Sequence, residues 1–94
     1  MEQYHLIHSY FNQENNRFIQ TVILTDTKER CLIALDTYTE ASEDNKVFLV
    51  NEEVINGVLV REFATVKRGY VRSLILVNAN QVISSLQLIK KQLR

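Results

Sequence analysis

From Arg17 onward, apolar residues recur mostly at every second position of this sequence. This period is typical of β-strands, because successive side chains of a strand point to opposite faces of the sheet. The pattern predicts five strands, at residues 17–24, 31–36, 46–50, 58–66 and 71–77. The connections between them are short, and strands joined by hairpins pair antiparallel. We therefore expect an antiparallel sheet.

Turn residues stand between the predicted strands. Asn56-Gly57 is a strong hairpin signal, because both residues tolerate the positive φ of a type I′ turn. Lys67-Arg68-Gly69-Tyr70 forms the next predicted turn. The sequence has two glycines and no proline, so each glycine is expected where the backbone requires it. The polar, acidic segment 39–45 is predicted to be a surface loop.

Helical spacing occurs at both ends of the chain. In residues 2–12, Tyr4, Ile7, Tyr10 and Phe11 follow one another at three- and four-residue intervals or lie adjacent, which predicts a short amphipathic helix. The C-terminal residues predict a second amphipathic helix with one apolar stripe. That stripe is formed by Val82, Ile83, Leu86, Ile89 and Leu93.

The length of 94 residues fits one small domain, and 46% hydrophobic with 23% charged residues is typical of a globular chain. We predict a mainly β fold with flanking helices. It consists of an N-terminal helix, a strongly bent five-stranded antiparallel sheet or partly open small barrel of SH3 or OB type, and a C-terminal amphipathic helix. The domain is expected to span residues 1–78, and the helix at 79–94 to belong to it or to dock a partner.

Cysteine content and hydropathy indicate the compartment. Cys31 is the only cysteine, so no disulfide can form within the chain. Neither a leader-like N-terminus nor a long apolar run is found. We expect a protein of the cytoplasm, the nucleus or both, without a membrane partner.

The charges of the chain divide by halves. Residues 1–53 carry ten acidic and four basic residues, and residues 54–94 carry one acidic and seven basic residues. The total of zero argues against nucleic-acid binding by bulk charge alone. The division suits a subunit that places unlike surfaces against its neighbours.

Few residues suit catalysis, and we expect no enzyme, no cofactor and no metal. His5 and His8 would share a helix face, but no acid or thiol lies at a companion spacing. Cys31 lies on the alternating pattern of a strand, which favours a buried and inert thiol. Two glycines twelve residues apart cannot form a phosphate-binding loop.

One segment carries a family resemblance. Residues 66–77, Val-Lys-Arg-Gly-Tyr-Val-Arg-Ser-Leu-Ile-Leu-Val, resemble the second signature of the Sm and like-Sm family. Leu32, Asp36 and Tyr38 match parts of the first signature, whereas Arg30 and Glu40 stand where the family usually has glycine and asparagine. The resemblance implies an Sm-like domain, with a helix before five strands.

The resemblance also implies candidate binding residues. Tyr38 would stack on a base, Asn45 would donate hydrogen bonds, and Arg68 with Gly69 would contact base or phosphate of a uridine-rich RNA. Family members assemble by pairing the fourth strand of one subunit with the fifth of the next. Because 58–66 and 71–77 are apolar and lack proline, we expect them to act as edges. The expected interface residues are Val58, Val60, Phe63, Val71, Ile75, Val82, Leu86 and Ile89.

Three functions follow as expectations. The first is a non-catalytic scaffold subunit in assembly of small nuclear ribonucleoproteins for splicing, because residues 47–51 resemble the third strand of Gemin-type Sm-like components of the survival motor neuron complex. Its partners would be other Sm-like proteins in a hetero-oligomer. The alternatives are an RNA-binding like-Sm ring subunit in RNA processing and an Sm-like auxiliary subunit of an N-terminal acetyltransferase.

Overall fold

A computed structural model describes residues 2–67 and 69–81 of the chain, with the side chain of Tyr70 left out. Its elements follow one another as two strands, one helix, three strands and a short 3₁₀ helix. They are β1 (Tyr4–Asn12), β2 (Arg17–Asp26), α1 (Lys28–Asp44), β3 (Phe48–Ile55), β4 (Val58–Thr65), β5 (Gly69–Asn78) and η1 (Ala79–Gln81).

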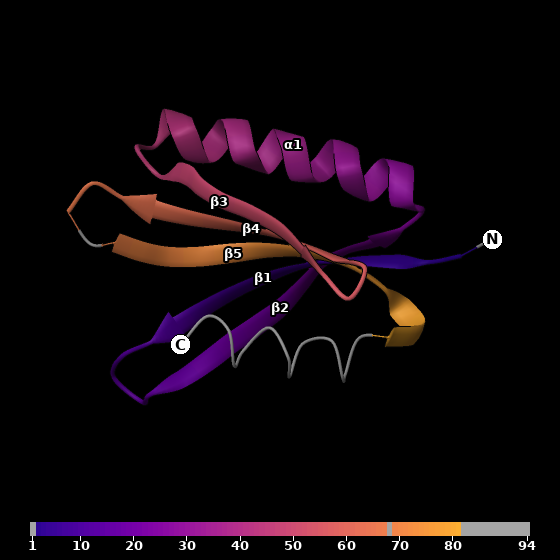
Figure 1. The fold of residues 1–94 in the computed structure, drawn as a ribbon, viewed down its shortest axis with the longest axis horizontal. Coiled ribbons are helices and arrows are strands. Elements are labelled where there is room, and N and C mark those ends of the chain that lie inside the picture. The colour runs from indigo at the N-terminus through magenta and orange to yellow at the C-terminus, as the bar shows by residue number, and fades with distance from the viewer. Residues whose placement is uncertain (1, 68, 82–94) are drawn as a thin grey trace.

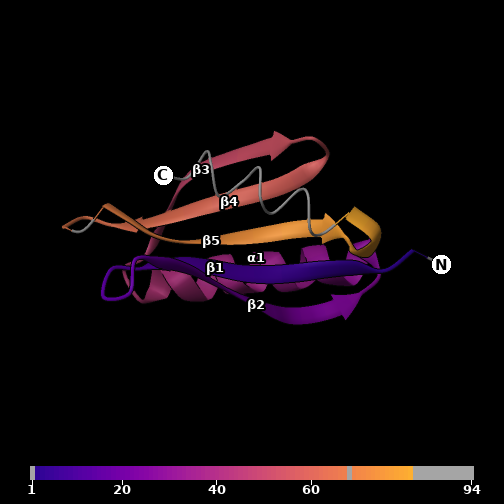
Figure 2. The same ribbon diagram turned by 90° about the horizontal axis from the view of Figure 1, so that it is seen from below.

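The strands form one antiparallel sheet in the order β2-β1-β5-β4-β3. α1 connects the two edge strands, β2 and β3, and lies across one face of the sheet (Figures 1 and 2). The three following strands form a meander that brings β5 beside β1. The first and last strands therefore meet in the middle of the sheet.

The predicted N-terminal helix is wrong, because residues 4–12 form β1. The apolar residues of this segment fit the two-residue period of a strand as well as the helical spacing. In β1, Leu6 faces α1, whereas Ile7 faces the opposite side of the sheet. Pairing decides between the two possibilities. Leu6 lies opposite Leu24 of β2 and Leu76 of β5, a partner seventy residues away in the chain that local periodicity does not reveal.

The predicted strand at 31–36 and loop at 39–45 are also wrong, because residues 31–36 and 39–44 lie in α1 and Asn45 is its C-cap. β2 ends at Asp26, and α1 begins at Lys28. Thr27 is the N-cap, and its side-chain oxygen accepts a hydrogen bond from the backbone N–H of Arg30. Cys31 and Leu35, four residues apart, turn the same helix face to the sheet.

The Asn56-Gly57 hairpin is confirmed. The two residues join β3 to β4 with φ values of 50° and 79°. Such positive angles suit asparagine and glycine, and they match the twist of the paired strands. The turn predicted at Lys67-Arg68-Gly69-Tyr70 is only partly found. The observed turn includes Val66 and Lys67, Arg68 lies outside the described residues, and Gly69 and Tyr70 belong to β5.

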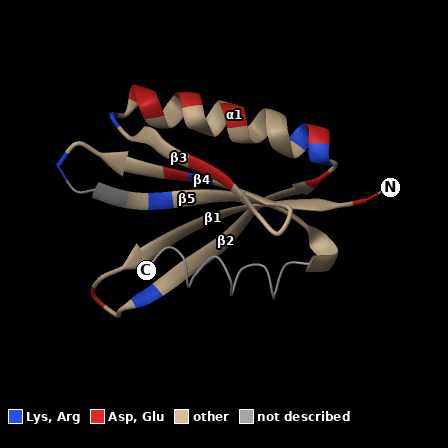
Figure 3. Ribbon diagram, in the orientation of Figure 1, with Lys and Arg blue, Asp and Glu red and all other residues tan. Residues whose placement is uncertain are grey.

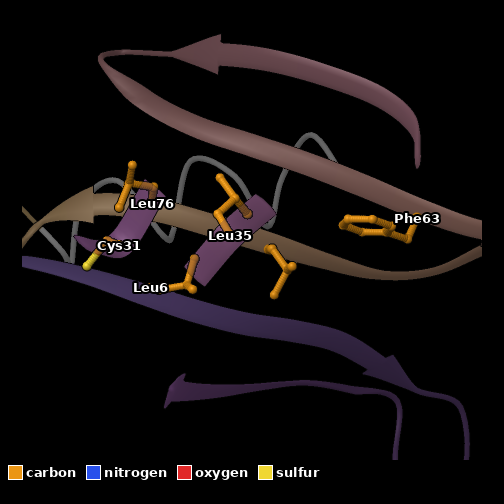
Figure 4. Close-up of a cluster of buried hydrophobic side chains, with 6 residues drawn as sticks. Leu6, Cys31, Leu35, Phe63 and Leu76 are labelled. Carbon is orange, nitrogen blue, oxygen red and sulfur yellow. The ribbon is translucent and has the colours of Figure 1, made fainter. Parts of the chain in front are cut away.

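The main core lies between α1 and the sheet (Figure 4). It contains Leu6, Cys31, Leu35, Phe63, Leu74 and Leu76, all at most 3% exposed. A second buried cluster lies on the opposite face of the sheet. It contains Ile7, Val58, Val60, Ile75 and Val77.

The predicted fold class is therefore corrected. The protein is mainly β with five antiparallel strands, but the sheet is open and is not a barrel, and its helix lies between β2 and β3. The Sm-like order of a helix followed by five strands is not found. Of the predicted C-terminal helix, residues 82–94 lie outside the described part of the chain.

Candidate functional site: an exposed edge strand

The edges of the sheet are β2 and β3, not the strands expected from the sequence. β4 pairs with β3 and β5, and β5 pairs with β4 and β1. Both strands thus have hydrogen-bonded neighbours on each side. A partner strand could join β4 or β5 only after one of these ladders had opened.

Of the five predicted interface residues that the structure describes, four are buried. Val58, Val60 and Ile75 belong to the second cluster, and Phe63 belongs to the main core, each at most 1% exposed. Val71 is half-buried in β5. The remaining three, Val82, Leu86 and Ile89, lie outside the described residues.

The predicted RNA-binding residues are distributed over α1 and β5. Tyr38 is exposed on α1 instead of ending a strand. Asn45 is the C-cap of α1, and its side-chain amide donates to the Ala41 carbonyl at 2.8 Å. Arg68 lies outside the described residues, and Gly69 begins β5. Asn45 therefore has a helix-capping role that the sequence pattern did not reveal.

The β3 edge is the most exposed apolar strand surface described. Val50 is 60% and Val54 is 68% exposed, and Phe48 is also exposed. A register shift between Leu49 and Asn51 places Val50 in a bulge opposite no residue of β4. The sequence predicted a strand here but ended it at residue 50, because the charged pair Glu52-Glu53 interrupts the apolar run.

Acidic residues surround this edge (Figure 3). Glu52 and Glu53 lie on β3 itself, and α1 carries further exposed acids beside it. Those on the second half of α1 are Asp36, Glu40, Glu43 and Asp44. On the face opposite α1, the side-chain amide of Asn51 donates to Glu53 at 3.0 Å and to Glu62 at 2.9 Å.

Arg61 of β4 holds the helix and the edge together. Its Nη1 donates to Asp36 Oδ1 of α1 at 2.8 Å, and its Nε donates to Glu52 Oε2 of β3 at 2.6 Å. Burial alone lowers the pKa of Arg61, but the hydrogen bonds and negative charges of Asp36 and Glu52 outweigh it and raise that pKa. The arginine is thus held charged between two carboxylates.

Groups suited to chemistry are dispersed. His5 and His8 point to opposite faces of β1, and His5 Nδ1 lies 2.7 Å from Thr25 Oγ1. Burial raises the pKa of the Cys31 thiol, which contacts the backbone carbonyls of Tyr4 and Asp26. Within residues 2–67 and 69–81, no three His, Cys, Asp or Glu side chains are grouped as metal ligands would be.

Over the same described ranges, no helix is both long and apolar enough to cross a membrane. Comparisons of the chain with protein-family models, with curated proteins and with solved structures found no match. The structure therefore defines a class of fold and no protein family. The described residues form an open five-stranded antiparallel sheet with one covering helix and an exposed apolar edge.

Proposed function

We propose that this protein is a non-catalytic binding subunit that adds a strand of a partner protein to the β3 edge. The observation that carries the proposal is the exposure of Val50 and Val54 on a strand that, within the described part of the chain, pairs on one side only, with β4. The free side of an edge strand presents backbone N–H and C=O groups that a partner strand can pair with. Exposed valines add apolar contacts at alternate positions.

The charge of the edge defines the chemistry of the partner. Glu52 and Glu53 lie between the two valines, and the neighbouring helix surface is acidic. A partner strand that alternates apolar with lysine or arginine side chains would complement this edge. Native edges are often protected by charged side chains, proline or a bulge. β3 contains no lysine or proline, but Glu52, Glu53 and the bulge at Val50 disfavour pairing with strands that lack complementary basic side chains.

The three roles expected from the Sm resemblance remain predictions. Scaffolding of ribonucleoprotein assembly, RNA binding in a like-Sm ring and support of an N-terminal acetyltransferase were all inferred with an Sm-like element order. The fold has a different order, so it lends these particular roles no support. From the first role we keep only the general proposal of a non-catalytic subunit that binds another protein.

The test compares proteins that co-purify with three tagged variants from the native host. Val50→Lys and Val54→Lys place a positive charge on the β3 edge, where a basic partner strand would be repelled. Val22→Lys is the matched control, because Val22 is 51% exposed on the opposite edge strand, β2. Circular dichroism verifies that each variant is folded.

We expect one partner to be lost with both β3 variants and retained with Val22→Lys. Sedimentation of the purified protein determines whether that partner is a second copy of the chain. Retention of every partner by all variants would contradict the proposal. Equal loss with Val22→Lys would also contradict it, because the effect would then not be specific to β3.

A further inference from the structure

A hollow of about 250 Å³ lies over β1 and β5, away from the β3 edge. It is lined by His8 and Tyr10 of β1 and by Val71 and Arg72 of β5. A register shift in the β4–β5 pair leaves Val71 unpaired between the positions opposite Phe63 and Ala64. Such a bulge redirects neighbouring side chains, and it contributes Val71 to the wall of the hollow.

Arg72 gives the hollow positive charge. Its Nη2 donates to Ser42 Oγ of α1, and its guanidinium lies 5.7 Å from the centre of the Phe63 ring. Among the described residues, no carboxylate forms an ion pair with Arg72. Its Nε is buried and lacks a hydrogen-bond acceptor. An arginine offers five donor hydrogens, so this one is incompletely used.

His8 adds a second nitrogen without a partner beside Arg72. Its Nε2 is buried and has no hydrogen-bond partner, and its ring stacks on Tyr10 with centroids 5.4 Å apart. Burial, and then the charge of Arg72, lower the pKa of His8, so the ring is neutral at pH 7. The two stacked rings thus line the hollow together with the Arg72 guanidinium.

Buried donors without acceptors destabilise a fold unless a ligand or water supplies the missing oxygen. We propose that the hollow binds an oxyanion, the phosphate or carboxylate group of a small molecule, with Arg72 as its principal contact. The planar guanidinium is suited to two oxygen atoms of such a group. Tyr10 and Val71 would pack against the rest of the ligand, and the negative charge would offset that of Arg72.

The test is a titration of isotope-labelled protein followed by NMR. Inorganic phosphate and acetate are added in separate arms, and sodium chloride at equal ionic strength is the salt control. We expect saturable shifts of the Arg72 Nε–H and His8 ring signals, with a dissociation constant on the order of 1 mM. Tighter binding of phosphate than of acetate favours a phosphorylated ligand, and the reverse order favours a carboxylate.

A second readout is the pKa of His8. A bound anion stabilises the imidazolium, so saturating phosphate or acetate is expected to raise that pKa. The charged group that faces His8 from β5 is Arg72, and Thr21, its neighbour on β2, is uncharged. Sodium chloride at the same ionic strength is expected to raise the pKa of His8 less than phosphate or acetate does.

Variants separate a site from a general salt effect. Arg72→Gln is expected to abolish the saturable shifts, and Arg72→Lys to weaken them while it keeps the charge. Arg17→Gln is the control, because Arg17 is exposed on β2. Unsaturable or absent shifts in the unmodified protein would overturn the proposal, whatever the stability of the variants. Equal shifts with chloride, or unchanged binding by Arg72→Gln, would also overturn it.

Discussion

Arg61 is the residue on which the arrangement of helix and edge most depends. Its side chain is 16% exposed and bonds to Asp36 of α1 and Glu52 of β3, while Thr39 accepts a further hydrogen bond at 3.1 Å. Charged hydrogen bonds of good geometry contribute more to stability than exposed ion pairs do. Arg61 therefore connects three consecutive elements, α1, β3 and β4.

We expect Arg61→Ala to lower the free energy of unfolding by about 2 kcal/mol, because its charged hydrogen bonds and the packing of its stem are lost. Arg30→Ala is the control, since its ion pair with Asp26 spans 3.6 Å at an exposed site and contributes at most about 0.5 kcal/mol. Urea denaturation of both variants measures the difference. Equal effects would show that Arg61 has no special role.

His8 makes stability depend on pH. Its pKa in the folded protein is below its ordinary value of 6.5, so the unfolded chain binds more protons between those two pKa values. Above pH 6.5, His8 is neutral in both states and does not reduce the free energy of unfolding. As the pH falls below 6.5 toward the folded pKa, protonation of the unfolded chain lowers that free energy. We expect His8→Gln to reduce the loss of unfolding free energy between about pH 7 and 5. Thermal denaturation across this range measures it, and an unchanged pH profile would contradict the expectation.

For single residues, burial was easier to predict than the secondary structure that produces it. Cys31 was predicted to be buried by alternation in a strand, and it is buried, but in a helix. Both patterns place Cys31 and Leu35 on one face, since their spacing of four fits either period. Ile33 distinguishes them, because a strand would bury it with its neighbours, whereas α1 leaves it 67% exposed.

At the scale of the element, substitutions of Leu35 and Ile33 test whether residues 28–44 form the helix α1. We expect Leu35→Ala to lower the free energy of unfolding by about 2–5 kcal/mol, because it removes a side chain from the main core. Ile33→Ala is expected to change it by at most about 0.5 kcal/mol. Chemical denaturation provides the measurement. Similar large losses in both variants would indicate the strand predicted from the sequence instead of the helix.

The β3–β4 hairpin depends on the backbone of its turn. Gly57 has φ 79°, and a Cβ atom placed there would meet no atom within 4 Å. Gly57→Ala therefore costs only the backbone strain, about 1 kcal/mol. Thermal denaturation is the measurement, with Asn56→Gly as a control that retains the conformation and is expected to have a smaller effect. An unchanged midpoint for Gly57→Ala would contradict the assigned turn.

For the whole molecule, the sequence predicted β2 and the last three strands from their alternating pattern. It also predicted the hairpin between β3 and β4, because a short-range turn signal connects these strands. It could not predict the strand order, because β1 pairs with β5 across most of the chain length. The edge was misplaced for the same reason. Apolar composition alone does not distinguish β4 and β5, buried between neighbours, from a free edge. The exposed valines of β3 became evident only once the order was known.

Amide hydrogen exchange of β3, with and without the partner recovered by co-purification, tests edge pairing most directly. In the free domain, the β3 amides that do not bond to β4 are expected to exchange rapidly, whereas the interior strands β4 and β5 are protected. Binding of the partner is expected to protect those β3 amides and to leave β2 unchanged. Protection of all β3 amides in the monomer, or no change at β3 in the complex, would contradict the proposed docking of a partner strand.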